Sequence, residues 1–323
     1  MKRAIGFILG LTALLSTSGL AQSQSDNWPT RPVTLIVPYA AGGYTDVVAR
    51  IVANSLEKEI GKPVVVEVRP GGGGMIGTQF VAQSAPDGYT FCVCSVGAIS
   101  VVPFIQKVNY DPIKDLAPVG LVSTAAQAVM VRKDLPVKNI AELVAYAKER
   151  PGKLNYGSSG VAGLTHYAVR LFESRTGMKA QHVPFKGGSQ ATLALVAGEI
   201  DFSFGNMTDA LPQIEAGTVR VIAVTSQEPV PFLPNVPTIH QALLPGFLAE
   251  SWNGIMAPAG TPKPIIQRMA DILNKMADDP AVVESLAKAG SAPVKGSPEK
   301  YAAQIRAEAD QWGPLLKAIV EKK

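Results

Sequence analysis

The sequence predicts an α/β fold of two lobes, each a mainly parallel sheet flanked by helices. Short apolar runs alternate with stretches of helical periodicity from Trp28 to the C-terminus, which is the pattern of α/β proteins. The apolar runs are continuous rather than alternating, as strands buried on both faces require. With 323 residues, the chain is also longer than one hydrophobic core comfortably organises. Two lobes joined by two crossovers satisfy all three observations.

The first lobe begins with repeated strand-then-helix steps. A continuous apolar run predicts a strand over 32–39, and the helix predicted over 45–61 carries Val48 and Val52 on one side. The same periodicities predict the elements that follow, namely a strand over 62–70, a helix ending in a turn over 76–88 and a strand over 89–96. This order of elements is that of a parallel sheet covered by helices.

The second lobe repeats the pattern. The run 116–132 reads as one long strand, and the helix over 139–152 places Ile140, Leu143 and Val144 on one stripe. The further elements are a strand over 153–160, a helix over 164–177, a strand over 180–188, a helix over 189–199, strands over 200–206 and 219–226, a strand and helices within 251–290, and a last helix over 298–322.

The tail is expected to return to the first lobe. We therefore predict that residues 26–122 and 250–323 form the first lobe and residues 123–249 the second. Two crossings of this kind, near 123 and near 250, make a hinged cleft.

The N-terminus is typical of a secretory signal peptide. Lys2 and Arg3 precede an apolar run, and the small residues Gly19 and Ala21 stand at the −3 and −1 positions of a cut after Ala21. The run is shorter than the roughly 20 residues that span a bilayer. We predict that residues 1–21 are removed and that the mature protein is exported to the periplasm.

The charge of the mature chain argues against a nucleic-acid partner. The sequence has 30 basic and 26 acidic residues. Lys2 and Arg3 leave with the predicted signal peptide, so 28 basic residues face 26 acidic ones. Nucleic-acid binding usually needs a basic stripe, which this near-neutral balance does not favour.

The cysteines and histidines form no predicted metal site. Cys92 and Cys94 share one face of a strand, a geometry that we expect to be poor for a disulfide, so they are predicted to be two small buried side chains. His166, His182 and His240 are too widely spaced for a metal-ligand pattern.

A glycine run after the second strand matches a dinucleotide motif. In "RPGGGGMIGT", Gly72, Gly74 and Gly77 fit G-x-G-x-x-G. However, no acid stands about 20 residues further on to hold a ribose, and the run lacks the Lys-Ser/Thr of a P-loop. We therefore expect no nucleotide or other cofactor, and predict that Gly71 to Gly74 permit a tight turn with positive φ.

Three strand-to-helix loops combine small residues with a hydroxyl directly before a helix. They are "PYAAGGYTD" (38–46), "YGSSGVAGLTH" (156–166) and "PFKGGSQ" (184–190). Each places a helix N-terminus, with free N–H donors and about half a positive charge, at the carboxyl edge of a sheet, where an anion binds well. The alternative is ordinary capping, in which Thr45, Thr165 and Ser189 satisfy their own helices. Two such loops facing each other across a cleft favour a carboxylate clamp.

These motifs resemble the substrate-binding proteins of tripartite tricarboxylate transporters, the Bug-type periplasmic binding proteins. The resemblance covers essentially the whole mature chain. It rests on "WPTRPVTLIVPYAAGGYTDVVAR", "VEVRPGGGGMIGT", "APDGYT", "LNYGSSGVAGLTHYA", "VPFKGGSQATLALVAGEIDF" and "NVPTIHQA…WNGIMAPAGTP". It implies a two-lobed binding protein of the type II-like flytrap kind, which captures small carboxylates and presents them to a membrane permease. A similar Arg-Pro-Gly-rich turn occurs in the family without a nucleotide.

The resemblance also implies where the ligand lies. In the family, its carboxylate sits between the first two loops, held by backbone N–H groups, hydroxyls and bridging waters. Carried over to this chain, the first side comprises Tyr39, Ala41, Gly43, Tyr44 and Thr45. The second side comprises Ser158, Ser159, Gly160, Thr165 and His166. Further lining is expected from Ser95, Gly97 and Asn206.

Two departures from the family bear on the ligand. Tyr44 stands where a glycine or small residue is frequent, so it either stacks on an aromatic acid or lies on the rim. Gly205 stands where an Asp is frequent, and because an acid there suits an amino group, its absence argues against amino acids. Lys186 either pairs with a distal carboxylate or is a surface charge. We expect an aromatic acid or a dicarboxylate such as terephthalate.

The leading function is thus a non-catalytic binding protein, expected to be a monomer without a metal or cofactor. A carboxylate-sensing partner of a membrane receptor is an alternative, since it would need the same closed lobes. A third reading is an exported serine hydrolase that uses Ser158 or Ser159 with His166 or His182. It is disfavoured because "YGSSG" lacks the G-x-S-x-G elbow and no acid is spaced to orient a histidine.

Overall fold

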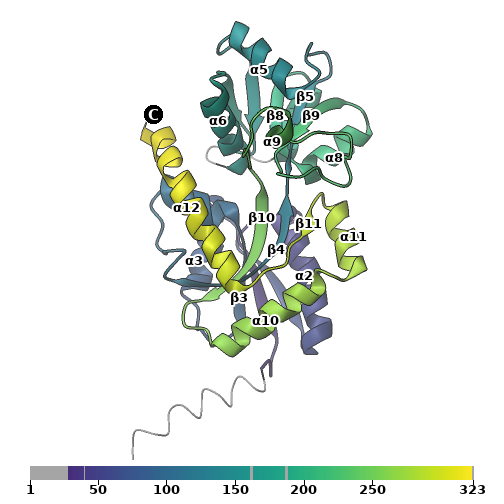
Figure 1. The fold of residues 1–323 in the computed structure, drawn as a ribbon. Coiled ribbons are helices and arrows are strands. Elements are labelled where there is room, and N and C mark those ends of the chain that lie inside the picture. The colour runs from purple at the N-terminus through teal and green to yellow at the C-terminus, as the bar shows by residue number, and fades with distance from the viewer. Residues whose placement is uncertain (1–27, 40, 161–162, 186–187, 322–323) are drawn as a thin grey trace, which may run out of the picture.

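The computed structural model describes residues 28–39, 41–160, 163–185 and 188–321, which form two sheets flanked by helices (Figure 1). The predicted signal peptide lies outside the described residues, as does Lys186. Within the described residues, no helix is long and apolar enough to cross a membrane. The predicted α/β class and the two-lobed arrangement are confirmed.

In the first sheet, two strands run against their neighbours. In spatial order it comprises β11 (Ala292–Pro293), β4 (Leu116–Ala125), β10 (Ser251–Pro258), β3 (Thr90–Ser95), β1 (Val33–Val37) and β2 (Val64–Val68). β1 pairs in parallel with β2 and β3, whereas β10 is antiparallel to both β3 and β4. The short β11 is antiparallel to β4. β10 is reversed because it enters the sheet from the second lobe.

The second sheet also contains a strand that runs against its neighbours. Its spatial order is β7 (Gln181–Pro184), β6 (Asn155–Ser158), β8 (Phe202–Asn206), β5 (Gln127–Arg132) and β9 (Val219–Val224). β6 is parallel to β7 and β8, while β5 is antiparallel to β8 and β9. Here β5 is the strand that arrives from the other lobe. Both sheets are therefore mixed: parallel strands interrupted by a crossover strand.

Helices cover both faces of each sheet. Those of the first lobe are α2 (Tyr44–Ile60), η1 (Gly72–Gly74), α3 (Met75–Ala82), η2 (Gly97–Val101), α4 (Val102–Ile105), α10 (Lys263–Met276), α11 (Pro280–Lys288) and α12 (Pro298–Glu321). Those of the second are α5 (Ile140–Glu149), α6 (Leu164–Thr176), α7 (Gly188–Val196), α8 (Met207–Glu215) and α9 (Ile239–Ala242). The sequence did not predict η2, α4, α8 or α9.

The two crossovers are hydrogen-bonded to each other. The run predicted as one long strand is two strands, β4 and β5, which belong to different sheets and meet at Ala126. The buried Thr225 hydroxyl accepts a hydrogen bond from the Gln127 N–H (2.8 Å) and donates one to the Ala249 carbonyl (2.7 Å). Thr225 thereby connects the outgoing chain to the returning one. The predicted lobe boundaries, 122/123 and 249/250, lie close to these crossovers and remain a prediction.

One hydrophobic cluster spans both lobes. Leu164 and Tyr167 of α6 pack with Trp252 of β10 and with Trp312 of α12. The rings of Tyr167 and Trp312 have centroids 4.7 Å apart. Figure 1 shows α12, in yellow, running from the first sheet to the side of α6. The C-terminal helix therefore forms a packed contact between the lobes.

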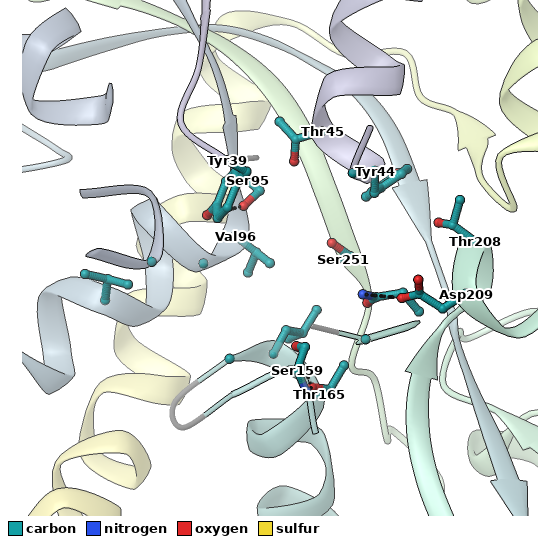
Figure 2. A pocket seen from close by; sticks show the side chains of 18 of the residues that line it. Tyr39, Tyr44, Thr45, Ser95, Val96, Ser159, Thr165, Thr208, Asp209 and Ser251 are labelled. Carbon is teal, nitrogen blue, oxygen red and sulfur yellow. Dashed lines mark hydrogen bonds between the residues drawn. The ribbon is translucent and has the colours of Figure 1, made fainter. Parts of the chain in front are cut away.

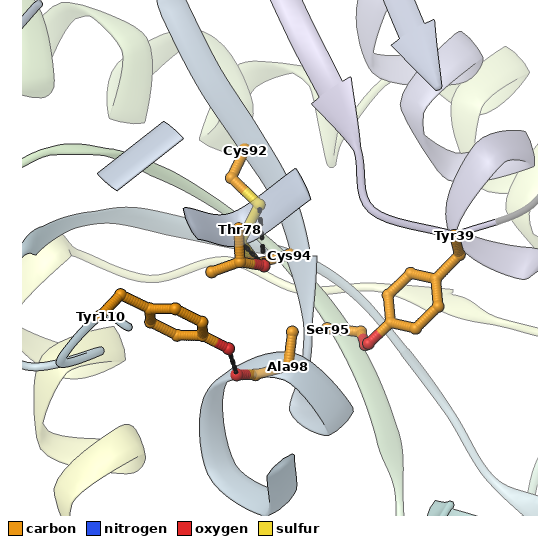
Figure 3. Close-up of a disulfide and its surroundings, with 7 residues drawn as sticks. All are labelled: Tyr39, Thr78, Cys92, Cys94, Ser95, Ala98 and Tyr110. Atoms are coloured by element: carbon orange, nitrogen blue, oxygen red, sulfur yellow. Dashed lines mark hydrogen bonds between the residues drawn. A yellow bond between two sulfur atoms is a disulfide. The ribbon is translucent and has the colours of Figure 1, made fainter. Parts of the chain in front are cut away.

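The structure corrects the prediction for the two cysteines. Cys92 and Cys94 form a disulfide, with their Cα atoms 5.2 Å apart (Figure 3). That separation lies within the usual range for disulfides, and the two residues point to the same face of β3. Both sulfur atoms face the buried Thr78 of α3. The assumption that an i, i+2 pair on a strand is geometrically unsuitable was wrong for this strand.

Candidate functional site

A cavity of about 850 Å³ opens between the two lobes and is lined by residues of both (Figure 2). Most of the residues predicted for the site lie in its wall: Tyr39, Ala41, Gly43, Tyr44, Thr45, Ser95, Gly97, Ser159, Thr165 and Asn206. Three do not line it: Ser158, Gly160 and His166. Lys186 lies outside the described residues.

Other lining residues were not named individually in the prediction, although Gly42, Gly163, Leu164, Gly188 and Ser189 lie within its three loops and Val96 lies between the predicted Ser95 and Gly97. They are Gly42, Gly72, Gly73, Val96, Val102, Ile105, Gln106, Gly163, Leu164, Gly188, Ser189, Thr208, Asp209 and Ser251. Of the apolar members, Val102 and Ile105 belong to α4 and Val96 directly precedes η2, and two of the polar ones, Thr208 and Asp209, come from the first turn of α8. These elements were not predicted, so their contribution could not be anticipated.

The first predicted loop brings the N-terminus of α2 to the cavity. Gly43 is the N-cap, with an extended backbone and no side-chain capping bond. The first N–H groups of a helix have no partner within the helix, and here the cap leaves them unpaired as well. Thr45 does not cap the helix, and its hydroxyl has no hydrogen-bond partner among the described residues. The helix start is therefore open toward the cavity.

The second predicted loop does the same with α6. Its N-cap, Gly163, again makes no side-chain capping bond. The Thr165 hydroxyl accepts a hydrogen bond from the Ser159 N–H (2.9 Å) and pairs with the Ser159 hydroxyl (2.9 Å), so it orders the loop instead of capping. By contrast, Asn139 caps α5 and Asp279 caps α11 with their side chains. Two uncapped helix starts, one from each lobe, thus line one cavity.

The predicted Ser158 and His166 lie behind the second loop. Ser158 is 1% exposed. Its hydroxyl bonds to the Gly160 carbonyl (3.0 Å) and to Nε2 of His182 (2.6 Å). His182 in turn stacks on His166, with ring centroids 3.9 Å apart, and on Tyr156. A Ser-His pair does exist, but Ser158 is buried and His182 half-buried, and neither lines the cavity.

Tyr39 and the glycine run form another part of the wall. The Ser95 hydroxyl donates to the Tyr39 hydroxyl (2.7 Å). All four glycines from Gly71 to Gly74 have positive φ, as predicted, and a Cβ on Gly74 would lie 2.8 Å from the Tyr39 hydroxyl oxygen. The run therefore permits close packing around Tyr39. Beyond the prediction, Gly72 and Gly73 also line the cavity.

Tyr44 is a fixed part of the wall. Its hydroxyl is hydrogen-bonded to that of Ser123 in β4 (3.0 Å). Burial raises the pKa of Tyr44, while the hydrogen bond with Ser123 opposes the shift. The phenol therefore remains neutral, and its ring is held at the edge of the cavity by the first crossover strand.

Asp209 is the one charged side chain among the described residues that line the cavity. Its Oδ2 lies 3.5 Å from Nδ2 of Asn206. Burial raises the pKa of the Asp209 carboxyl, and the hydrogen bond from Asn206 opposes that shift. Gly205, whose lack of a side chain led us to expect no acid here, is buried and does not line the cavity. The acid comes from one helical turn further along the chain.

Comparison with known proteins assigns the chain to a family. Residues 48–320 match the family described as "Tripartite tricarboxylate transporter family receptor". A Rhodopseudomonas palustris protein, Rpa4515 with adipate, is 34% identical, with a TM-score of 0.81 over 90% of this chain and 97% of that one. The periplasmic binding protein BugD is 34% identical (TM-score 0.77; 90% and 98% covered). MatC from Rhodopseudomonas palustris, with bound malate, is 31% identical (TM-score 0.78; 90% and 100%).

Proposed function

The chain belongs to the tripartite tricarboxylate transporter receptor family, a family of non-enzymatic solute receptors. We propose that it captures a small carboxylate in the periplasm and delivers it to the membrane permease of such a transporter. The proposal is carried by one observation: two uncapped helix N-termini, at Gly43 and Gly163, line the same cavity from opposite lobes. Adipate and malate, found with two relatives, are both carboxylates.

The carboxylate would be held by backbone donors instead of a cation. No Lys, Arg or His is among the described residues of the cavity wall. Free N–H groups and the dipole of a helix start stabilise an anion even though the helix start has no formal positive charge. The hydroxyls of Thr45 and Ser159 add donors beside the two helix starts. A ligand bound to both would favour the closed arrangement of the lobes.

The body of the ligand would rest on an apolar surface. The rings of Tyr39 and Tyr44 line the cavity together with Val96, Val102 and Leu164. Because the Tyr44 ring is anchored to Ser123, it offers a fixed face for stacking. These contacts support a carboxylic acid with an aromatic or an extended aliphatic body, and terephthalate and adipate are the test compounds.

Thermal unfolding tests the carboxylate clamp. Benzoate, terephthalate, adipate and malate are compared with their amide analogues at equal concentrations. A ligand at 100 times its Kd stabilises the native state by about 2.7 kcal/mol, so we expect the acids to raise the Tm and the amides not to. Equal shifts for acid and amide would reject the clamp, and a larger shift for aliphatic than for aromatic acids would reject stacking on Tyr44.

A further inference from the structure

Asp209 lies where the function proposed above gives it no role. It is in the first turn of α8, immediately after β8, and its half-buried side chain lines the cavity with that of Asn206 (Figure 2). A receptor that only had to bind anions would gain nothing from an acid in its wall. The carboxylate must therefore either support the protein or contact a different part of the ligand.

The carboxylate of Asp209 lies against the start of a third helix. A Cβ added to Gly188, the first residue of α7, would lie only 2.1 Å from Oδ2 of Asp209. This is the third loop in which the sequence predicted an anion-binding helix start. A protein carboxylate already lies there, so a second ligand carboxylate brought to this end of the cavity would meet a like charge.

The surroundings of Asp209 leave room for a hydrogen-bond donor. Among the described residues, no Lys, Arg or His forms an ion pair with it, and its one side-chain partner is the amide of Asn206, at the long distance of 3.5 Å. Partial burial raises the pKa of Asp209, so the neighbouring groups offset only part of the cost of burying its negative charge. A buried acid in this state is stabilised by a donor or cation placed beside it.

Resting on the carboxylate-binding function above, we propose that Asp209 determines specificity. It selects carboxylates that carry a hydrogen-bond donor at the end opposite their carboxylate, and it prefers an ammonium group to a hydroxyl group. The two ends of the cavity then have complementary preferences. The starts of α2 and α6 accept the anionic end, and Asp209 accepts the donor end. A second ionised carboxylate at that position is disfavoured.

Matched pairs of ligands test this directly by calorimetry. Each pair keeps the carbon skeleton and replaces one carboxylate by an amine: succinate with 4-aminobutanoate, glutarate with 5-aminopentanoate, adipate with 6-aminohexanoate, and terephthalate with 4-(aminomethyl)benzoate. 4-Hydroxybenzoate is the hydroxyl member, and hexanoate and benzoate are the references without a second group. We expect the amino member of at least one pair to bind about tenfold or more tightly than its dicarboxylate partner.

The Asp209→Asn variant removes the charge and keeps the shape. We expect it to lose the preference, with the amino member weakened about tenfold and hexanoate and benzoate unchanged. Glu215→Gln, at the exposed far end of the same helix, is the control for net charge and should keep the preference. The Tm of each unliganded variant shows whether Asp209→Asn has merely weakened the fold.

The outcomes separate this inference from the proposed function. If carboxylates bind but the ratio within every pair is the same in the wild type and in Asp209→Asn, the specificity role is rejected and the proposed function stands. If Asp209→Asn lowers the Tm and weakens all ligands alike, Asp209 supports the fold and the inference is again rejected. If no carboxylate binds to the wild type, the proposed function fails and the inference fails with it.

Discussion

Glu250 has a half-buried carboxyl at the end of the returning crossover, directly before Ser251 of the cavity wall. Burial raises its pKa to about 7, and its charge also contributes to the raised pKa of Tyr44. A carboxyl whose pKa is higher in the folded than in the unfolded state binds its proton more tightly when folded. It therefore lowers the stability as the pH rises.

We expect the free energy of unfolding to fall by about 3 kcal/mol between pH 4.5 and pH 7 through this residue. Glu250→Gln should match the wild type near pH 4.5 and exceed it at pH 8, because the amide cannot ionise. Urea unfolding at both pH values measures the difference. Glu284→Gln, an exposed acid on α11, is the control. The same pH dependence in Glu250→Gln and wild type would contradict the assignment.

Some predictions made for individual residues were confirmed by the structure, and others were wrong. The glycines from Gly71 to Gly74 were predicted to have positive φ because only glycine adopts that backbone freely, and they do. Asp209 was missed because nothing local distinguishes an acid in a short helix from a surface charge. The Cys92–Cys94 disulfide was excluded on a general rule about strands, and the position of the two side chains overrode it.

At the scale of elements, the important feature is the loop that precedes α6. The Thr165 hydroxyl holds the backbone of Ser159, so the loop is shaped by one residue of the helix that it precedes. Ser158 and the stacked His166 and His182 support it from behind. We expect these contacts of Ser158 and Ser159 to hold the start of α6 in place beside the cavity, which is what binding by preorganised donors requires.

Thr165→Val should therefore weaken carboxylate binding while the protein stays folded. Valine keeps the volume of the buried side chain but leaves the Ser159 N–H without its acceptor, at a cost of about 1–3 kcal/mol, part of which appears as a lower affinity. Calorimetry with a carboxylate that stabilises the wild type measures the effect. Ser174→Ala, which removes an exposed hydroxyl from the same helix, should leave affinity unchanged. Equal affinities for Thr165→Val and wild type would show that the loop does not depend on this contact.

Most of the longer helices and strands were predicted from the sequence, whereas short elements and those with an unexpected break were not. The strand β1 and the helices α2 and α6 follow from continuous apolar runs and helical stripes. The helix α8 is short and contains Pro212, a residue that argues against a helix interior, so it was missed. The division between β4 and β5 was missed because Ala125 and Ala126 contain no signal for a break. Which sheet a strand joins depends on tertiary contacts that no local pattern contains.

At the scale of the whole molecule, α12 connects the lobes. Its Glu308 accepts hydrogen bonds from Ser100 (2.6 Å) and from the indole of Trp252 (2.8 Å), both in the first lobe. One turn further, Trp312 packs on Tyr167 of the second lobe. The two crossovers and this helix thus connect the lobes in the arrangement described here.

We expect Trp312→Ala to lower the free energy of unfolding by about 3–5 kcal/mol, as removal of a large buried aromatic side chain does. Because the lost contact joins the lobes, the radius of gyration from small-angle scattering should also increase. Trp312→Phe keeps a ring against Tyr167 and should show a smaller change in both measurements. If Trp312→Ala lost stability without any change in the radius, α12 would contribute to the core but not to the lobe arrangement.

The position of β10 also affects how the chain is assembled during synthesis. This strand lies between β3 and β4 in the first sheet, but it is made about 125 residues later than β4. Until residue 258 has emerged, β3 and β4 each present an unpaired edge, which other chains can bind. The nascent N-terminal portion is therefore vulnerable to aggregation, and a protein truncated before β10 should accumulate as insoluble material.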